Sequence, residues 1–399
     1  MAIQTNLSNS VRTRYSATYL EAAQFSRLYD QFALPVSKVG VENAARLGTT
    51  VQVEFLSDMV PGTSTISTVA DINPQTLRDA TATISPTSRG EALELAEVLD
   101  LNVFTNYGEQ RMKILGKNQM ESVEILARDV TNQGNLAFRP AARSSLDAGT
   151  TTHRLTDSQM VKAANRLKTL KTPPFIGNNK NQYMALMHGD AYTDLLAGGN
   201  VVNALIYQGK EQLFNQELGS YGDFKLVVDP WAKVFGAAGA ANASAVGTTL
   251  NGAVNALATS IVVSSATNIT AGQRLFIGNI ETGNTHYVNN EIVYVSDSYT
   301  SGTTVTIIGE GANGGLRFDH ASGVTVSNAD NVYPVIFGGP MSIAKVFDAQ
   351  TGEFGAVVGP QETGRLNQFK TIGWKFYGGY GRWVESWLLR GEFSSSVDA

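Results

Sequence analysis

Residues 106–133 read NYGEQRMKILGKNQMESVEILARDVTNQ, the longest stretch of the sequence with the pattern of a single helix. At 100° per residue, one face of this helix collects five apolar side chains, Met112, Leu115, Val123, Leu126 and Val130. The helix would be about 40 Å long at 1.5 Å per residue, and Gly134 is placed to end it because glycine readily adopts the left-handed conformation. We therefore expect the rest of the chain to be arranged along this helix.

The opposite face of the helix carries charges at the four-residue spacing that lets opposite charges meet. The pairs are Glu109–Lys113, Lys117–Glu121 and Glu124–Arg128. This pattern predicts a solvent-facing side that includes Glu124. A helix of this kind could also be a strut of a large α/β enzyme. A coiled coil is disfavoured because the heptad spacing does not continue past Val130.

Composition narrows the class of protein. The chain has 399 residues, enough for two or three domains. It has no cysteine, which excludes disulfides, thiolate nucleophiles and cysteine-bound metals.

No signal pattern and no apolar run of about 18 residues occur, so we expect neither secretion nor membrane insertion. The net charge of −5 argues against nucleic-acid binding through an overall positive field. Only 16% of residues are charged, which is typical of a protein that buries much of its surface against copies of itself.

Two segments precede the long helix. Residues 1–45 are predicted to form an N-terminal arm whose helix is anchored by Tyr19 and Phe25, although an ordinary first helix on a core fits equally well. Residues 46–101 have the alternation of extended strands, including Phe55, on both sides of a long polar tract. Two strands joined by such a tract predict a projecting hairpin. A loop this long is uncommon in a compact enzyme unless it has a function.

The composition changes sharply at about residue 236. Residues 236–332 contain two bases, Arg274 and Arg317, and six acids, so they carry −4 of the net charge. Short strand-like runs recur there between Gly, Asn, Ser and Thr residues. We predict a separate small antiparallel barrel or sandwich inserted into a loop, with few core contacts crossing its boundary.

The sequence shows no pattern expected of an active site. Residues 309–314, GEGANG, fit the dinucleotide pattern formally but lack a following helix, so we interpret them as a tight turn. No nucleophile elbow or phosphate-binding loop is present. The four histidines lack metal-ligand spacing; they are His153, His188, His286 and His320. We therefore predict no catalytic residue, no cofactor and no metal.

The order of these elements resembles that of the major capsid proteins of tailed bacteriophages with the Hong Kong 97 fold. Within that group, the sequence is most similar to the N-four-type coat proteins. Three stretches carry the resemblance. They are Ser88-Arg89-Gly90-Glu91 to Leu99-Asp100, Glu217-Leu218-Gly219 to Val228, and Gly373-Trp374-Lys375. Gly90 and Asp100 match the pattern, whereas Arg89 stands where an aromatic residue is usual. The insert is similar, from Ala271-Gly272 through Glu291 to Gly323, to a small β module of other virion proteins.

The resemblance implies an α+β fold with an arm, an extended hairpin loop, a spine helix, and peripheral and axial domains, here with an inserted all-β domain. The implied boundaries are 1–45 for the arm, 46–101 for the hairpin, 102–177 for the spine and first peripheral part, 178–235 for the axial domain, 236–332 for the insert and 333–399 for the return strands. The implied function is a shell of hexamers and pentamers around phage DNA. Candidate contacts between subunits are Tyr19, Phe25, Phe55, Arg89 and Glu91.

The resemblance also implies partners: copies of the same chain, a separate scaffolding protein, a portal, decoration proteins, and packaged DNA contacted without sequence specificity. The expected location is the virion, after assembly in the bacterial cytoplasm. Two alternatives remain at this point, a phage tail or decoration protein and, less favoured, a glycan hydrolase with a carboxylate pair.

Overall fold

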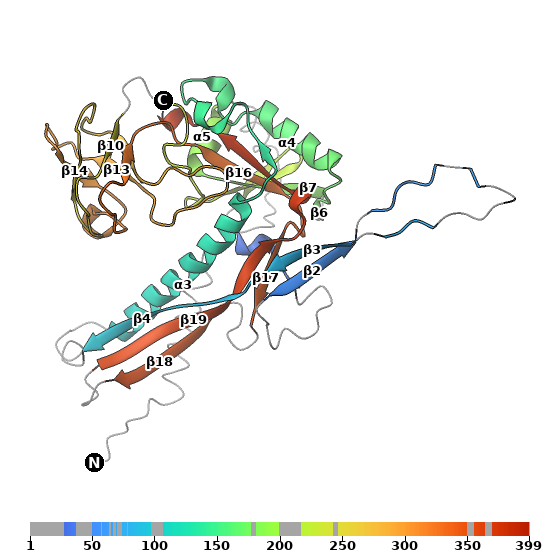
Figure 1. Cartoon of the computed structure of the whole chain (residues 1–399), viewed down its shortest axis with the longest axis horizontal. Helices are drawn as coiled ribbons and strands as arrows, with labels where there is room; N and C mark the ends of the chain where they lie inside the picture. Colours follow the sequence, from blue (N-terminus) through green and yellow to red (C-terminus); the bar gives the residue numbers. More distant parts are fainter. Residues whose placement is uncertain are drawn as a thin grey trace, which may run out of the picture. The chain divides into compact units, whose positions relative to one another are not determined.

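A computed structural model describes residues 28–36, 50–56, 58–63, 65–66, 69, 74–77, 79–96, 107–176, 181–198, 217–241, 246–348, 355–363 and 369–398. The fold mixes a few helices with many strands (Figure 1). The chain divides into two compact units: the first unit comprises Met1–Val130 with Met341–Val384, and the second comprises Thr131–Pro340 with Glu385–Ala399.

The first unit is built on a five-stranded sheet. Its strands are β1 (Ala33–Pro35), β4 (Thr87–Ala96), β17 (Ile343–Phe347), β18 (Ala356–Thr363) and β19 (Phe369–Arg382). They follow the order β1-β17-β19-β18, and β4 also pairs with β19. A separate hairpin is formed by β2 (Val51–Leu56) and β3 (Asp79–Ile84), paired from Val51↔Ile84 to Leu56↔Asp79. This two-stranded ribbon extends away from the sheet (Figure 1).

The long helix is α3 (Tyr107–Asn132). Its buried residues Met112, Leu115 and Val123 pack against Ile372, Trp374 and Phe376, which lie on strand β19. The indole Nε1 of Trp374 donates a hydrogen bond of 2.9 Å to Asn118 Oδ1 on α3. The spine helix is thus fixed to the sheet by an apolar seam and one directed polar contact.

The structure shifts the buried face of α3 from the predicted one. Leu126 and Val130 are only half-buried, while Gln119 and Ala127 have no exposed surface. The expectation that Glu124 lies on the solvent side is wrong, because its side chain is buried. The apolar residues of the sequence therefore predict the first half of the buried face of α3. The polar residue Gln119 and the small residue Ala127 continue this face.

The second unit contains a mixed sheet in the order β5-β20-β16-β7-β9-β8, with β6 beside β7. Its strands are β5 (Ala137–Phe138), β6 (Phe175–Ile176), β7 (Asn181–Met187), β8 (Glu217–Tyr221), β9 (Phe224–Val228), β16 (Tyr333–Gly338) and β20 (Leu388–Phe393). Helices α4 (Asp157–Thr169) and α5 (Gly189–Ala197) bury Met160, Leu167 and Leu195 in the same core as the sheet residues Ala185, Leu226 and Phe337.

A second sheet of this unit curls on itself. Its six strands follow the order β10-β15-β12-β13-β14-β11, and an isolated bridge between Leu250 and Val263 joins the two edges. The strands are β10 (Gly247–Thr249), β11 (Ser260–Val262), β12 (Arg274–Gly278), β13 (Glu291–Val295), β14 (Thr304–Ile308) and β15 (Thr325–Ser327). It encloses its own apolar core, which includes Ile261, Leu275, Val293, Val305 and Val326.

Candidate assembly surfaces

The base of the β2–β3 hairpin is fixed to the first unit. Val53 and Ile84 are buried at this end. Gly381 on β19 lies so close to Ile84 that an added Cβ would come within 2.5 Å of its Cγ1. A glycine is therefore needed where the hairpin meets the sheet. The candidate contact residue Phe55, further along β2, is half-buried.

Beyond its base the hairpin exposes apolar side chains. Gln75 ties the two arms of the loop together, since its side chain accepts a hydrogen bond of 3.1 Å from the Val60 amide and donates one of 3.0 Å to the Val60 carbonyl. Large apolar side chains with at least 49% exposure follow the loop: Leu56, Met59, Val60, Ile66, Val69 and Leu77. Soluble proteins seldom expose so many apolar groups together unless a partner covers them.

Strand β4 offers a second candidate surface. Its ten residues pair with β19 from Thr87↔Gly378 to Ala96↔Phe369. The candidate contact residues Arg89 and Glu91 are both exposed on it, as is Leu93. Charged side chains on such a strand discourage uncontrolled pairing between sheet edges. Tyr19 and Phe25, the other two candidates, lie outside the described residues.

Two buried carboxylates hold the segment of residues 28–36 against the first unit. The Glu124 carboxylate accepts hydrogen bonds from the amides of Leu28, at 2.7 Å, and Tyr29. The Asp30 carboxylate pairs with Lys345 at 3.2 Å and accepts a hydrogen bond of 2.6 Å from the Tyr380 hydroxyl. Neither anchor was predicted from the sequence, because a charged residue at helical spacing normally faces solvent.

The second unit contains a buried cluster around Glu392, whose carboxylate has no exposed surface. Three guanidinium groups pair with it: Arg143 at 2.6 Å, Arg390 at 2.9 Å and Arg139 at 3.3 Å. Burial alone would raise the pKa of Glu392, but hydrogen bonds and positive charge from Arg143, then Arg390 and Arg139, outweigh burial and hold the pKa below its ordinary value. The cluster therefore keeps Glu392 ionised.

A further cluster ties strand β12 to the C-terminal segment. Arg274 donates hydrogen bonds to the Tyr333 hydroxyl, at 3.0 Å, and to the Asp398 carboxylate, at 2.8 Å. Asn331 also donates to Asp398 at 3.0 Å. Burial raises the pKa of Tyr333 and, despite Arg274, that of Asp398. These contacts join residues inside the predicted insert to residues outside it.

The loop between β12 and β13 is joined to the second unit in the same way. Glu281 pairs with Lys233 at 2.7 Å, and both side chains are buried. Arg143 donates a hydrogen bond of 3.1 Å to the Glu281 carbonyl. Buried ion pairs and hydrogen bonds therefore cross the boundary at residues 236–332, whereas the apolar core of the curled sheet is drawn from residues 246–326 alone.

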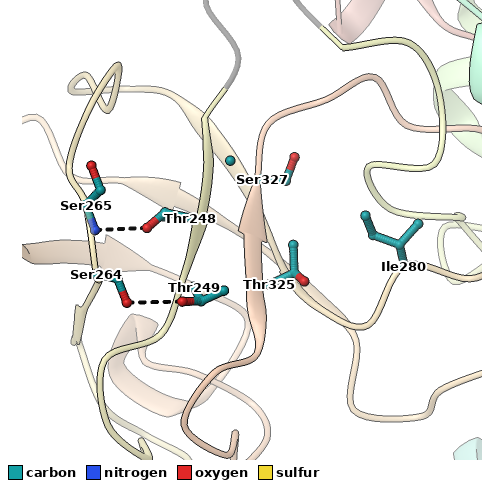
Figure 2. Close-up of a pocket in the computed structure, with 8 residues that line it drawn as sticks. Thr248, Thr249, Ser264, Ser265, Ile280, Thr325 and Ser327 are labelled. Carbon is teal, nitrogen blue, oxygen red and sulfur yellow. Dashed lines mark hydrogen bonds between the residues drawn. The ribbon is translucent and has the colours of Figure 1, made fainter.

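The hollow in Figure 2 lies on the curled sheet and has a volume of about 530 Å³. Hydroxyl groups and one apolar side chain line it, from Thr248, Thr249, Ser264, Ser265, Ile280, Thr325 and Ser327. Thr249 and Ser264 hydrogen-bond at 3.0 Å, and the Ser265 amide donates to the Thr248 hydroxyl at 2.9 Å. These hydroxyls reinforce the junction of the two sheet edges, and the lining has no acid, base or thiol for catalysis.

The residues singled out for chemistry have structural partners. His320 is buried and pairs with Glu291 at 2.7 Å, and the Gly-rich stretch 309–314 forms a turn in which the Gly309 amide donates to the Gly314 carbonyl. Among the described residues, no group of three or more His, Asp or Glu side chains could hold a metal ion. None of the helices described is both long and apolar enough to cross a membrane.

No protein-family model matches the sequence, and no curated protein matches it. Solved structures do match. The capsid of Ralstonia phage GP4 aligns with 88% of this chain and 84% of its own, at a TM-score of 0.55 and 9% identity. The capsid asymmetric unit of cyanophage Pam1 aligns with 88% of this chain and 87% of its own, at a TM-score of 0.50 and 11% identity. The fold is that of Hong Kong 97-like phage capsid proteins. This confirms the predicted fold class, with its spine helix α3 and extended hairpin.

Proposed function

We propose that this chain is a major capsid protein that self-assembles into hexamers and pentamers and forms an icosahedral head shell around phage DNA. The observation that carries the proposal is the combination of the capsid fold with a projecting hairpin whose apolar side chains are exposed. A neighbouring copy would cover these side chains. A ring of identical subunits satisfies this need for every copy at once.

The finer assignments follow from the same proposal. The chain would be a structural protein of the N-four-type subfamily, located in the virion after assembly in the host cytoplasm. Its remaining partners would be a scaffolding protein, a portal and decoration proteins. The six-part division into arm, hairpin, peripheral, axial, inserted and return segments is kept, with the strands from Gly247 to Ser327 as the body of the insert.

Electron microscopy of the purified full-length protein tests the proposal. Closed shells or hexameric rings are expected. Fibres or tubes would favour a tail protein. Monodisperse monomers that do not assemble would contradict the shell function and favour an enzyme.

A further inference from the structure

The imidazole of His188 caps helix α5 from the residue just before its first turn. Its Nδ1 accepts a hydrogen bond of 3.2 Å from the Asp190 amide, which is one of the first-turn amides that no helical carbonyl can reach. The Pro230 backbone forms a hydrogen bond with the same ring. Nδ1 can accept the bond from Asp190 only while it carries no proton, so the cap requires a neutral imidazole.

Charged and titratable groups from four elements surround this histidine. The Asp190 carboxylate of α5 lies 3.4 Å from Nδ1 of His188. The Tyr333 ring of β16 packs on the imidazole, with ring centroids 5.5 Å apart. Arg274 of β12 lies 3.7 Å from the Asp190 carboxylate, and Arg274 and Tyr333 both donate hydrogen bonds to Asp398. Only 18% of the His188 side chain is exposed, so water can hydrate a charge on it only in part.

Helix α5 also holds the end of the chain. Residues 394–398, which we call the C-terminal strap, lie beside α5 (Figure 1). The Ser395 hydroxyl donates a hydrogen bond of 3.3 Å to the Asp190 carbonyl, and the Ser396 amide donates one of 3.1 Å to the Asp194 carboxylate. Ser395 has no exposed surface. The histidine cap and the strap therefore meet at the first turn of α5.

We propose that His188 is a pH-sensitive switch whose protonation opens the cap of α5 and releases the C-terminal strap. A proton on Nδ1 turns this atom from an acceptor into a donor, so the Asp190 amide loses its partner. Nδ1 then donates to the Asp190 carboxylate and draws it away from Arg274. The imidazolium also places a second positive charge near Arg274, which is held against the strap by Asp398. The switch lies within one subunit and does not depend on shell assembly.

The direction of the effect follows from the pKa of His188. Burial lowers this pKa, Asp190 raises it and Arg274 lowers it, and the result lies below the ordinary value of 6.5. When the cluster opens, water reaches the ring and its pKa returns towards 6.5. The open form then binds the proton more tightly, so the closed form has its full stability above pH 6.5 and loses stability as the pH falls below that value.

Protonation of Asp398 does not explain the same opening. Burial raises the pKa of Asp398 above its ordinary value, although Arg274 and the hydrogen bonds from Tyr333 and Asn331 lower it. The closed form therefore binds a proton at Asp398 more tightly than the open form does, and acid favours closure through this group. An opening in acid has the sign expected of His188.

The absence of cysteine from the sequence allows the strap to be probed with a single thiol. Ser395→Cys places this thiol at a buried position of the full-length protein, and a pyridyl disulfide reagent, which also reacts in acid, reports its exposure. The matched variant is Ser395→Cys/His188→Asn, because asparagine is a good cap acceptor and does not titrate. Comparison of the two variants at one pH cancels the intrinsic pH dependence of the thiol.

At about pH 5.5, one unit below the ordinary histidine pKa, the thiol should react up to about tenfold faster in Ser395→Cys than in Ser395→Cys/His188→Asn. At about pH 7.5, where the imidazole is neutral in the closed and in the open form, the two rates should agree. Equal rates at both pH values would overturn the proposal.

Thermal melting of proteins that keep Ser395 gives a second measurement. Between about pH 7.5 and about pH 5.5, the melting temperature of the wild type should fall more than that of His188→Asn. The control is His153→Asn, since Nδ1 of His153 also accepts a backbone hydrogen bond, from the Asp147 amide at 3.1 Å. This control should keep the wild-type decline. Parallel melting of the wild type and His188→Asn, or loss of the decline in His153→Asn alone, would overturn the proposal.

Discussion

Arg143 donates two hydrogen bonds to the Glu392 carboxylate, from Nε at 2.9 Å and from Nη2 at 2.6 Å. The Arg143 guanidinium also lies 4.1 Å from the centre of the Phe235 ring. Glu392 has no exposed surface, so water cannot replace these bonds if they are lost. Removing one partner of such a buried pair leaves the other charge uncompensated, which is costlier than losing an exposed pair.

Glu392→Gln should therefore lower the free energy of unfolding by about 3–5 kcal/mol. Urea unfolding of unassembled subunits measures this change. The matched control is Asp223→Asn, which removes a carboxylate from an exposed pair with Lys168 and should cost at most about 1 kcal/mol. Similar losses in the two variants would show that the Glu392 cluster contributes no more than a surface pair.

The same cluster predicts how stability depends on pH. The pKa of Glu392 is lowered in the folded protein relative to its ordinary value of 4.5. Its contribution is therefore complete above pH 4.5 and is lost as the pH falls through the lower folded-state pKa. As the pH is lowered from neutral to acidic, the melting temperature of the wild type should fall more steeply than that of Glu392→Gln. Parallel declines would exclude Glu392 as a source of acid sensitivity.

The spine helix, the hairpin and the strand-rich stretch are predictable from the sequence because each has a strong local period. The second half of the buried face of α3 is not, because the deciding residues there are Gln119, Ala127 and Glu124. Their burial depends on what packs against them, including residues 28–36, about a hundred positions earlier. Arg143 has no local signal as a partner of Glu392 either, because it lies 249 positions earlier in the chain.

The buried face of α3 gives a prediction with chemically matched variants. Leu115 is 2% exposed, whereas Leu126 is half-buried. Leu115→Ala should cost about 2–5 kcal/mol of subunit stability, and Leu126→Ala should cost less. Lys117→Ala removes an exposed charge and should leave the melting temperature close to wild type. If Leu126→Ala destabilised the subunit more than Leu115→Ala, the assignment of the buried face would be wrong.

The hairpin is expected to act between subunits. Ile66 is 74% exposed, so Ile66→Asp should leave subunit melting and circular dichroism unchanged while abolishing shells. Ile66→Leu keeps the apolar character of the side chain and should retain assembly. Deletion of residues 61–74 should also abolish shells with little loss of helical signal. Normal shells from Ile66→Asp would show that this apolar group is not covered by a neighbouring copy.

The buried ion pairs and hydrogen bonds between the curled sheet and the rest of the second unit lead to the last prediction. Replacing residues 237–331 with a short Gly/Ser linker would remove Arg274 from Tyr333 and Asp398, and Glu281 from Lys233. This deletion should therefore lower the melting temperature of the unassembled subunit. Within the full chain, Arg274→Met should cost about 1.5–3 kcal/mol, the usual range for hydrogen bonds to charged groups.

Arg317→Met is the matched control for this prediction. It makes the same substitution within the insert, but Arg317 pairs with Glu310, whose side chain is 73% exposed, and lies 5.8 Å from the centre of the Trp231 ring, so the loss should be smaller, about 1 kcal/mol. Urea unfolding of both variants and thermal melting of the deletion measure the effect. A deletion variant that melts with wild type, together with equal losses from Arg274→Met and Arg317→Met, would mean that the curled sheet is an independent module after all. In that case the Arg274 and Glu281 contacts would not stabilise the subunit, and the curled sheet would be joined to the flanking strands by the chain connections alone.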